Sequence, residues 1–425
     1  MFSIRTLSVF LLVTVLVVEA AKKPTKRSGK SKRKTSASKR KVSTPAAPKN
    51  LQFTVPLFDA ARGPHQSAAD YLDRVYPGIR FAEKSKNDYL NNFYAANISL
   101  GTKFQSVSVR VLTSGSGLWT YEKGCYTRFV SGFQPKRYYM KQSKTKRLNE
   151  RTELHDRITD VFKIGRYVNR RQPFVAATSQ LPSKPKGFKE PIEPARLLNV
   201  HGVLALGNSE TTNGITPVWS SMANSLKAPI YTVWLKRQIV ECKNNLAGYI
   251  SFGGFENGLC NTTLGPFKYF NMEPKGTKWT VKLEKFLFNN GNDITKNLVD
   301  PSKNVASVEL GASHIYAPRE VVEDVVKTAN ASLEAGTFVV KCSDFGWLYD
   351  FIFYIEGQEL KVPARHFVSD IGLENGNCAL LIDESTRLQT PWVLGDVFFR
   401  TFCTQFNQKE KRLGLMRSID SVCKP

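Results

Sequence analysis

Two loops of the chain set small polar residues between apolar runs, and their side chains could take part in acid–base chemistry. Val109–Trp119 reads VRVLTSGSGLW, and Ser307–Pro318 reads SVELGASHIYAP. Glu309 is the one carboxylate in either loop. Ser114 and Ser116 are neutral hydroxyls without an adjacent base, which makes them poor nucleophiles. Carboxylate chemistry at these loops would therefore depend on Glu309.

The flanking residues predict how these loops are held. Each loop follows a run of strand-forming residues and leads into another, which indicates a strand, a tight turn and a second strand. Much later in the chain come two apolar segments, GVLALG from Gly202 and WVLGDVFF from Trp392. Two loops with two such partners predict an internally duplicated all-β protein with a cleft between its halves.

These motifs resemble the pepsin-like aspartic proteases. The C-terminal stretch WVLGDVFFRTFCTQFNQKEKRLGLM is the most specific match, TPVW and SFGG agree with it, and the resemblance covers about Leu51 to Met416. It implies an all-β-dominated, bilobed fold with two β lobes related by a pseudo-twofold axis and a few short helices. In that family each lobe supplies an Asp-Thr/Ser-Gly turn, and the two carboxylates share one proton while they grip the attacking water.

Two departures from the family pattern fall on the catalytic positions. Laid over that pattern, Leu112 occupies the first Asp position and Glu309 the second. An isobutyl group cannot accept the proton of water, and the extra methylene of glutamate displaces its charge by about 1.5 Å. The resemblance therefore implies a degenerate dyad with no catalytic residue. The surrounding turn residues are Thr113, Ser114, Gly115, Leu310 and Gly311, and the supporting segments are Val203, Leu204, Ala205, Val393, Leu394 and Gly395.

A third departure concerns the flap that covers the substrate in the family. This chain offers KRYYMKQSKTKRLNERTELHDR, which contains no glycine, and Leu148 falls near the family's flap tyrosine. Hairpin tips normally use Gly or Asn to reach positive φ, so we expect the flap to be rebuilt or lost. Asp156 and Asp160 are the nearby carboxylates that could restore activity, whereas Asp396 matches a structural Asp of the family.

The N-terminal residues predict secretion. Residues 1–20 have the basic start, apolar run and small residues of a signal peptide, and no other segment is long enough to span a membrane. Residues 21–50 contain no acid and many Lys and Arg residues, and account for much of the net charge of +25. We expect this segment to be disordered, either as a polybasic arm for a polyanion or as a solvated leader.

The rest of the chain divides into three parts. Residues 51–92 look like the family's propeptide, with a strand in LQFTVPLF and a helix in SAADYLDRV; the alternative is an N-terminal strand and helix of the mature fold. Residues 93–226 and 227–425 are the expected N-terminal and C-terminal lobes. In the second lobe, PREVVEDVVKTANASL from Pro318 predicts an amphipathic helix.

Seven cysteines behind a signal peptide indicate disulfides and an extracellular location. The resemblance implies a Cys342–Cys378 bond, and Cys242 and Cys260 bracket an expected hairpin, which suggests a second. Cys125, Cys403 and Cys423 remain, so at least one thiol stays free or pairs between chains. Asn97, Asn261 and Asn330 lie in glycosylation sequons, although we expect Asn97 to lie near a buried strand.

Other site classes receive little support. The five histidines are scattered without metal-ligand spacing, and the glycine-rich stretches do not match a phosphate loop. We therefore expect no metal, no cofactor and no nucleic-acid partner. Three functions remain open: a secreted pseudoprotease that binds an unidentified protein or peptide, an active acid endopeptidase in which Glu309 works with an unplaced acid, and a polyanion-binding scaffold.

Overall fold

The computed structural model describes residues 50–59, 94–122, 138–151, 155–177, 201–208, 215–237, 246–273, 278–288, 292–293, 304–373, 375–387 and 390–421. All of them belong to one compact unit, Ala47–Pro425. The predicted signal peptide, the basic segment up to residue 49 and the helix expected in SAADYLDRV lie outside the described residues. Within the part that is described, no helix is long and apolar enough to cross a membrane.

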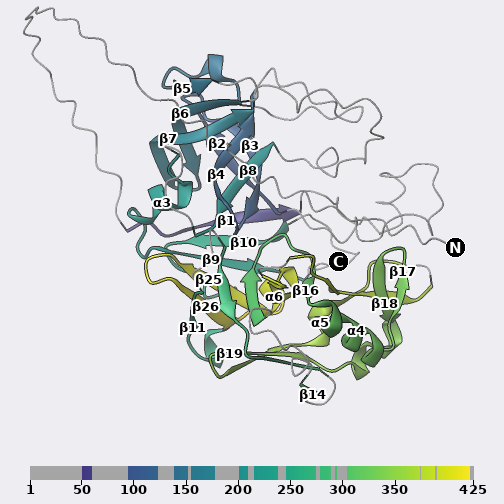
Figure 1. Cartoon of the computed structure of the whole chain (residues 1–425). Coiled ribbons are helices and arrows are strands. Elements are labelled where there is room, and N and C mark those ends of the chain that lie inside the picture. Colours follow the sequence, from purple (N-terminus) through teal and green to yellow (C-terminus); the bar gives the residue numbers. More distant parts are fainter. Residues whose placement is uncertain are drawn as a thin grey trace, which may run out of the picture. The chain divides into compact units, whose positions relative to one another are not determined.

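The largest sheet draws strands from both halves of the chain (Figure 1). In spatial order its thirteen strands are β11 (Lys268–Asn271), β26 (Arg412–Arg417), β25 (Phe402–Asn407), β9 (Ile230–Leu235), β10 (Leu246–Phe252), β1 (Phe53–Asp59), β2 (Tyr94–Leu100), β3 (Gln105–Leu112), β8 (Gly202–Leu206), β4 (Ser116–Tyr121), β7 (Tyr167–Ala177), β6 (His155–Ile164) and β5 (Arg147–Arg151).

Strand β1 lies where the two halves of this sheet meet. It pairs antiparallel with β10 from Phe53 to Phe58, and its last two residues pair with β2. Phe53, Val55 and Leu57 are buried while the residues between them are more exposed, as the alternating sequence predicts. The N-terminal strand is therefore an integral part of the main sheet.

Three smaller sheets are formed by the C-terminal half. The five-stranded sheet has the order β12 (Thr280–Lys282), β15 (Val305–Val308), β24 (Trp392–Leu394), β16 (Ile315–Ala317) and β23 (Ile382–Glu384). One four-stranded sheet contains β14 (Asn292–Asp293), β13 (Lys285–Phe288), β19 (Phe351–Ile355) and β20 (Gln358–Val362). The other contains β17 (Ser332–Glu334), β18 (Thr337–Lys341), β22 (Asn377–Leu380) and β21 (Val368–Ser369).

Helices are few and short in the described residues. The α-helices are α3 (Val218–Ala223), α4 (Arg319–Thr328), α5 (Ala364–Phe367) and α6 (Asp396–Thr401), and the 3-10 helices are η2 (Met140–Gln142), η4 (Thr262–Leu264) and η7 (Cys342–Trp347). Helix α4 begins directly after Pro318 and buries Val321, Val322 and Val325, which confirms the predicted amphipathic helix. The predicted all-β-dominated fold class is likewise confirmed.

Two disulfides join described cysteines. One links Cys342 to Cys378, and the other links Cys260 to Cys403 across 143 residues of sequence. The predicted Cys242–Cys260 pair is therefore wrong. Beyond β10 the chain runs to the edge of β26, where Cys260 pairs with Ser418, and this contact brings its sulfur to β25. Cys242 lies outside the described residues.

Candidate active site

The first candidate turn connects β3 to β4. Strand β3 ends at Leu112, the chain turns through Thr113 and Ser114, and Gly115 adopts the positive φ of 73° that glycine accommodates without strain. Strand β8 lies between the two strands, parallel to β3 with Ala205 opposite Leu112, and antiparallel to β4. The segment with Val203 and Leu204 thus supports this turn from behind.

The second turn has the same strand arrangement, with its positive-φ glycine one position earlier than in the first turn. Strand β15 ends at Val308, Glu309 follows, and Gly311 has a φ of 87° before β16 begins. Strand β24, which carries Val393 and Leu394, runs parallel to β15 and antiparallel to β16. A Cβ added to the next residue, Gly395, would collide with the backbone carbonyl oxygens of Ala312 and His314. The two halves therefore repeat one supersecondary unit.

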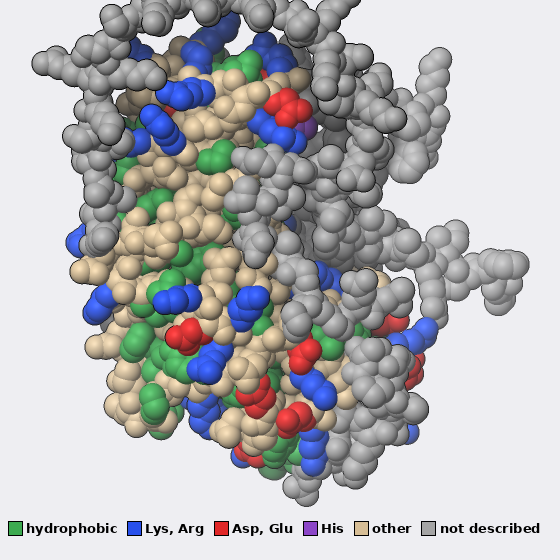
Figure 2. All heavy atoms as spheres, turned by 60° about the vertical axis from the view of Figure 1, so that its left-hand side comes forward, with side chains coloured by type: hydrophobic (Ala, Val, Ile, Leu, Met, Phe, Trp, Pro, Cys, Tyr) green, Lys and Arg blue, Asp and Glu red, His purple; other side chains and the backbone are tan. Residues whose placement is uncertain are grey.

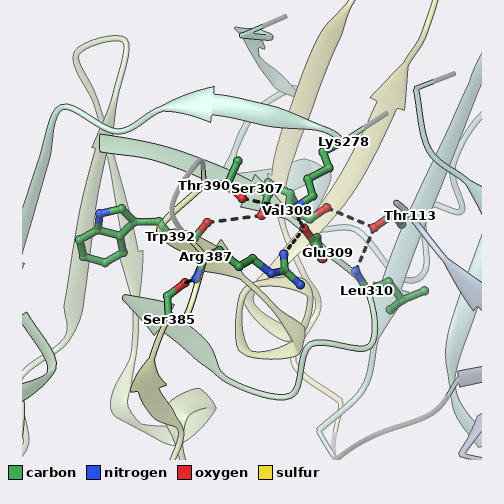
Figure 3. A network of polar contacts seen from close by, with 10 residues as sticks. All are labelled: Thr113, Lys278, Ser307, Val308, Glu309, Leu310, Ser385, Arg387, Thr390 and Trp392. Carbon is green, nitrogen blue, oxygen red and sulfur yellow. Dashed lines mark hydrogen bonds and ion pairs between the residues drawn. The ribbon is translucent and has the colours of Figure 1, made fainter. Parts of the chain in front are cut away.

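A single hydroxyl joins the two turns. The Thr113 Oγ1 donates to the Val308 carbonyl oxygen at 3.1 Å and accepts from the Leu310 N–H at 2.9 Å (Figure 3). Thr113 is completely buried, so water does not compete with these bonds. The equivalent residue of the second turn is Leu310, which has no hydroxyl to return the contact. The linkage is therefore one-sided.

Glu309 lies beside this linkage and is held by two cations. Its Oε1 accepts a hydrogen bond from the Arg387 Nη1 and lies 3.5 Å from the Lys278 Nζ (Figure 3). Burial by itself would raise the pKa of Glu309, but Arg387, Lys278 and a hydrogen bond with Ser307 outweigh it and lower the net pKa. The carboxylate is therefore charged at neutral pH and already committed to partners.

The family can be assigned once this paired geometry is compared with known proteins. Residues 93–418, most of the chain, match the model of the Eukaryotic aspartyl protease family. The chain belongs to the eukaryotic aspartyl protease family. Its bilobed pepsin-like fold and its two supported turns agree with this membership.

The curated relatives span most of this family member. Aspartic protease 17 of Caenorhabditis elegans is 24% identical over 354 residues, which cover 79% of this chain and 85% of the relative. Pregnancy-associated glycoprotein 1 of Bos taurus is 26% identical over 345 residues, covering 77% and 82% of the two chains. Embryonic pepsinogen of Gallus gallus is 24% identical over 339 residues, covering 77% and 80%.

In this aspartyl protease family member, Glu309 is not paired with a second carboxylate among the described residues. Its side-chain hydrogen bonds and ion pairs involve Arg387, Lys278 and Ser307. Asp396, the acid that follows Gly395, is fully buried and accepts hydrogen bonds from the Gly311 N–H and the Tyr94 hydroxyl. Asp396 therefore orders the backbone of the second turn.

The carboxylates near the expected flap are also engaged in structure. Asp156 forms a two-point contact with Arg151, at 3.0 Å from Nε and 3.1 Å from Nη2. Asp160 accepts from the hydroxyls of Tyr138 and Thr145, each at 2.6 Å. These contacts tie β5, β6 and the residues before them together. Neither carboxylate contacts Glu309, so the structure lends no support to their restoring a dyad.

The flap region forms a hairpin of β5 and β6 despite its lack of glycine. Strand β5 is exposed along its whole length and includes Leu148, and the residues that join the two strands, 152–154, lie outside the described part. A hairpin is thus present at this place in the chain, with a charged strand as its outer edge. The expectation that the flap is rebuilt or lost stays a prediction, because the residues at the tip of this hairpin lie outside the described part.

An arginine missed by the sequence analysis completes the contact between the turns. Arg110 lies two residues before Leu112 and thus on the same face of β3, and its Nη2 lies 3.5 Å from the Gly311 carbonyl oxygen. Burial lowers the pKa of Arg110 to about 10, and the charge of Asp396 opposes that effect. The sequence pattern that could have identified Arg110 is a single charged residue within the apolar run VRVL. Lys278 and Arg387 carried no comparable signal.

His201 and the three sequon asparagines lie outside the two turns. His201 accepts a hydrogen bond from the Ser108 N–H through Nδ1. Asn97 lies in the mostly buried strand β2, as expected, but is itself exposed, because its side chain points to the solvent side of the strand. Asn330 is exposed after α4, and Asn261 is partly buried and accepts from Thr263. Use of these asparagines for glycosylation stays a prediction.

Proposed function

We propose that this chain is a secreted pepsin-like pseudoprotease that binds a protein or peptide ligand without cleaving it. The observation that carries the proposal is the state of the two turns: Leu112 stands at the position equivalent to Glu309, and Glu309 is already neutralised by Arg387. By family resemblance these are the two catalytic Asp positions. The site then holds one carboxylate where the reaction requires two.

The chemistry explains why one carboxylate is insufficient. In the working dyad one group accepts the proton of the attacking water while the other donates to the substrate, because proximity separates their pKa values. Leu112 can do neither. Glu309 is held in the charged form by its two cations, so it cannot serve as the acid. Loss of one member of a catalytic set costs orders of magnitude in rate.

The binding part of the proposal rests on what the site retains. Thr113 links the two turns, and β8 and β24 pair with the strands that carry them. The backbone framework of the site is therefore complete although the two carboxylates of the dyad are not. Two disulfides support an oxidising, extracellular compartment. A relative is named Pregnancy-associated glycoprotein 1, which is compatible with secretion.

A cleavage assay tests the proposal. We expect the purified protein to show no pepstatin-sensitive cleavage of denatured haemoglobin or a peptide library between about pH 3 and 6, where carboxylate dyads work. Glu309→Ala is the matched variant: pepstatin-sensitive activity that disappears in it would establish an irregular aspartic endopeptidase instead. The double variant Leu112→Asp, Glu309→Asp should not reach full activity, since the flap hairpin also differs.

Polyanion binding is a second candidate function, favoured by the surface charge of the first half. Among described residues 94–177, eight exposed cations have no ion-pair partner, and Glu150 is the one exposed acid. The cations are Lys103, Lys141, Lys144, Arg147, Lys163, Arg166, Arg170 and Arg171. Figure 2 shows Lys and Arg predominating at the end formed by β5 to β7, whereas the opposite end carries both signs.

Retention on heparin, followed as salt is raised, tests this candidate. Binding by a basic surface should weaken steeply with salt, and Arg170→Gln with Arg171→Gln should elute earlier than wild type. The pair Lys268→Gln, Lys409→Gln changes net charge equally at other exposed positions and should elute close to wild type. Deletion of residues 21–50 measures the contribution of the basic segment. Equal elution of all these proteins would contradict the candidate.

A further inference from the structure

The cations around Glu309 face solvent more than the carboxylate does. The side chains of Arg387 and Lys278 are 23% and 26% exposed, whereas that of Glu309 is 8% exposed. A ligand that approaches this cluster therefore meets guanidinium and ammonium groups before the carboxylate. The cluster of two cations and one anion has a net charge of one positive unit.

Much of the hydrogen-bonding capacity of these cations is unused. A guanidinium has five N–H donors, and the contact made by that of Arg387 within the described chain is to Glu309. Lys278 has three donors and contacts Glu309 and the Thr390 Oγ1. Most of the planar fork of Arg387 is thus left to bind a second oxyanion, and such forks fit carboxylates in a two-point geometry.

Lys278, the second cation of the cluster, is held in its charged form at a cost unless a second anion joins Glu309. Burial lowers the pKa of Lys278, Glu309 opposes that shift, and the charge of Arg387 adds to it. One arginine would suffice to neutralise Glu309, so Lys278 is a surplus charge in a partly desolvated place. An incoming carboxylate would supply the missing counter-charge.

We propose that Arg387 and Lys278 form an anion-binding subsite that accepts a carboxylate of a peptide ligand. This inference rests on the proposed function, because it assigns a ligand class to the same site. Leu112 is partly exposed and precedes Thr113, whose hydroxyl bonds Val308 and Leu310 on either side of Glu309, so the first turn contributes an apolar residue to this site. The preferred ligand is therefore a peptide in which a carboxylate adjoins an apolar side chain. The carboxylate comes from an acidic side chain or from the chain terminus.

Binding of three fluorescent peptide pools to the full-length protein at pH 7 tests this subsite. All pools share apolar flanking residues. The first has one glutamate and an amidated C-terminus, the second has glutamine and an amidated C-terminus, and the third has glutamine and a free C-terminal carboxylate. We expect the first or the third pool to bind about tenfold more tightly than the second, as one charge-assisted two-point contact allows. The stronger of the two identifies the source of the carboxylate.

Variants separate a binding role from a structural one. Arg387→Gln should abolish the discrimination between charged and neutral pools, and Glu309→Gln should increase it, because both cations lose their internal partner. A purely structural ion pair would not gain ligand affinity in Glu309→Gln. The triple variant Arg387→Gln, Lys278→Gln, Glu309→Gln removes all three charges of the cluster, so it leaves no unpaired charge there, controls for misfolding and should bind the pools without preference. Arg171→Gln, on the β7 surface, should retain the wild-type ratio.

The outcomes distinguish this inference from the proposed function. Equal binding of all three pools, or an unchanged ratio in Arg387→Gln, would overturn the carboxylate subsite and leave a non-cleaving binding protein. Absence of binding by every pool, with the protein folded, would overturn both the subsite and peptide binding at these turns. Discrimination that is lost in Arg387→Gln and enhanced in Glu309→Gln supports both.

Discussion

Replacement of Thr113 by valine tests whether one hydroxyl holds the two turns together. Valine has nearly the same shape, so Thr113→Val creates no large cavity but removes both the donor to Val308 and the acceptor for the Leu310 N–H. Thr113 is fully buried, and each buried polar group that loses its partner costs about 1–3 kcal/mol. Two groups lose their partner, so we expect the free energy of unfolding to fall by about 2–6 kcal/mol.

Urea denaturation at pH 7, followed by tryptophan fluorescence, measures this effect. Thr113→Ser is the matched control because it keeps the hydroxyl and loses one methyl group, which should cost about 1 kcal/mol. A loss below about 1 kcal/mol in Thr113→Val, or equal losses in the two variants, would refute the view that the hydroxyl links the turns.

Three further predictions concern pH, backbone packing and the long-range disulfide. Burial, followed by the charge of Arg400, lowers the pKa of His314 from 6.5 to about 3. Between about pH 6.5 and 3 the unfolded chain therefore binds a proton at this residue that the native state does not bind, and the free energy of unfolding should fall with pH by up to about 1.4 kcal/mol per pH unit. The melting temperatures at pH 7 and pH 4 should accordingly differ less in His314→Asn than in wild type. Gly395→Ala should prevent folding to a soluble protein because its Cβ meets two backbone carbonyls, whereas Gly258→Ala, with no atom within 4 Å of the added Cβ, should express and melt like wild type. Replacing both Cys260 and Cys403 by serine should lower the free energy of unfolding by roughly 2–5 kcal/mol relative to the oxidised wild type, with both proteins measured under oxidising conditions so that Cys342–Cys378 stays intact.

Local patterns of the sequence determined much of the secondary structure and the repeated unit. The alternation of FTVPLFD predicted β1, and the spacing of Val321, Val322 and Val325 after Pro318 predicted α4. A strand repeats its buried side every two residues and a helix about every 3.6 residues, so both patterns can be recognised within a short stretch of sequence. The similarity of the two loop motifs likewise predicted two equivalent turns.

The tertiary structure alone decided which side chains meet. Arg387 reaches Glu309 across 78 residues of sequence, and Cys260 bonds Cys403 across 143. Neither pairing has a local signal, because each depends on how strands from different parts of the chain are ordered in a sheet. For the same reason the sequence identified Glu309 as the remaining carboxylate but could not show that Arg387 and Lys278 form ion pairs with it. That charge arrangement exists only once β12, β15 and β24 lie side by side.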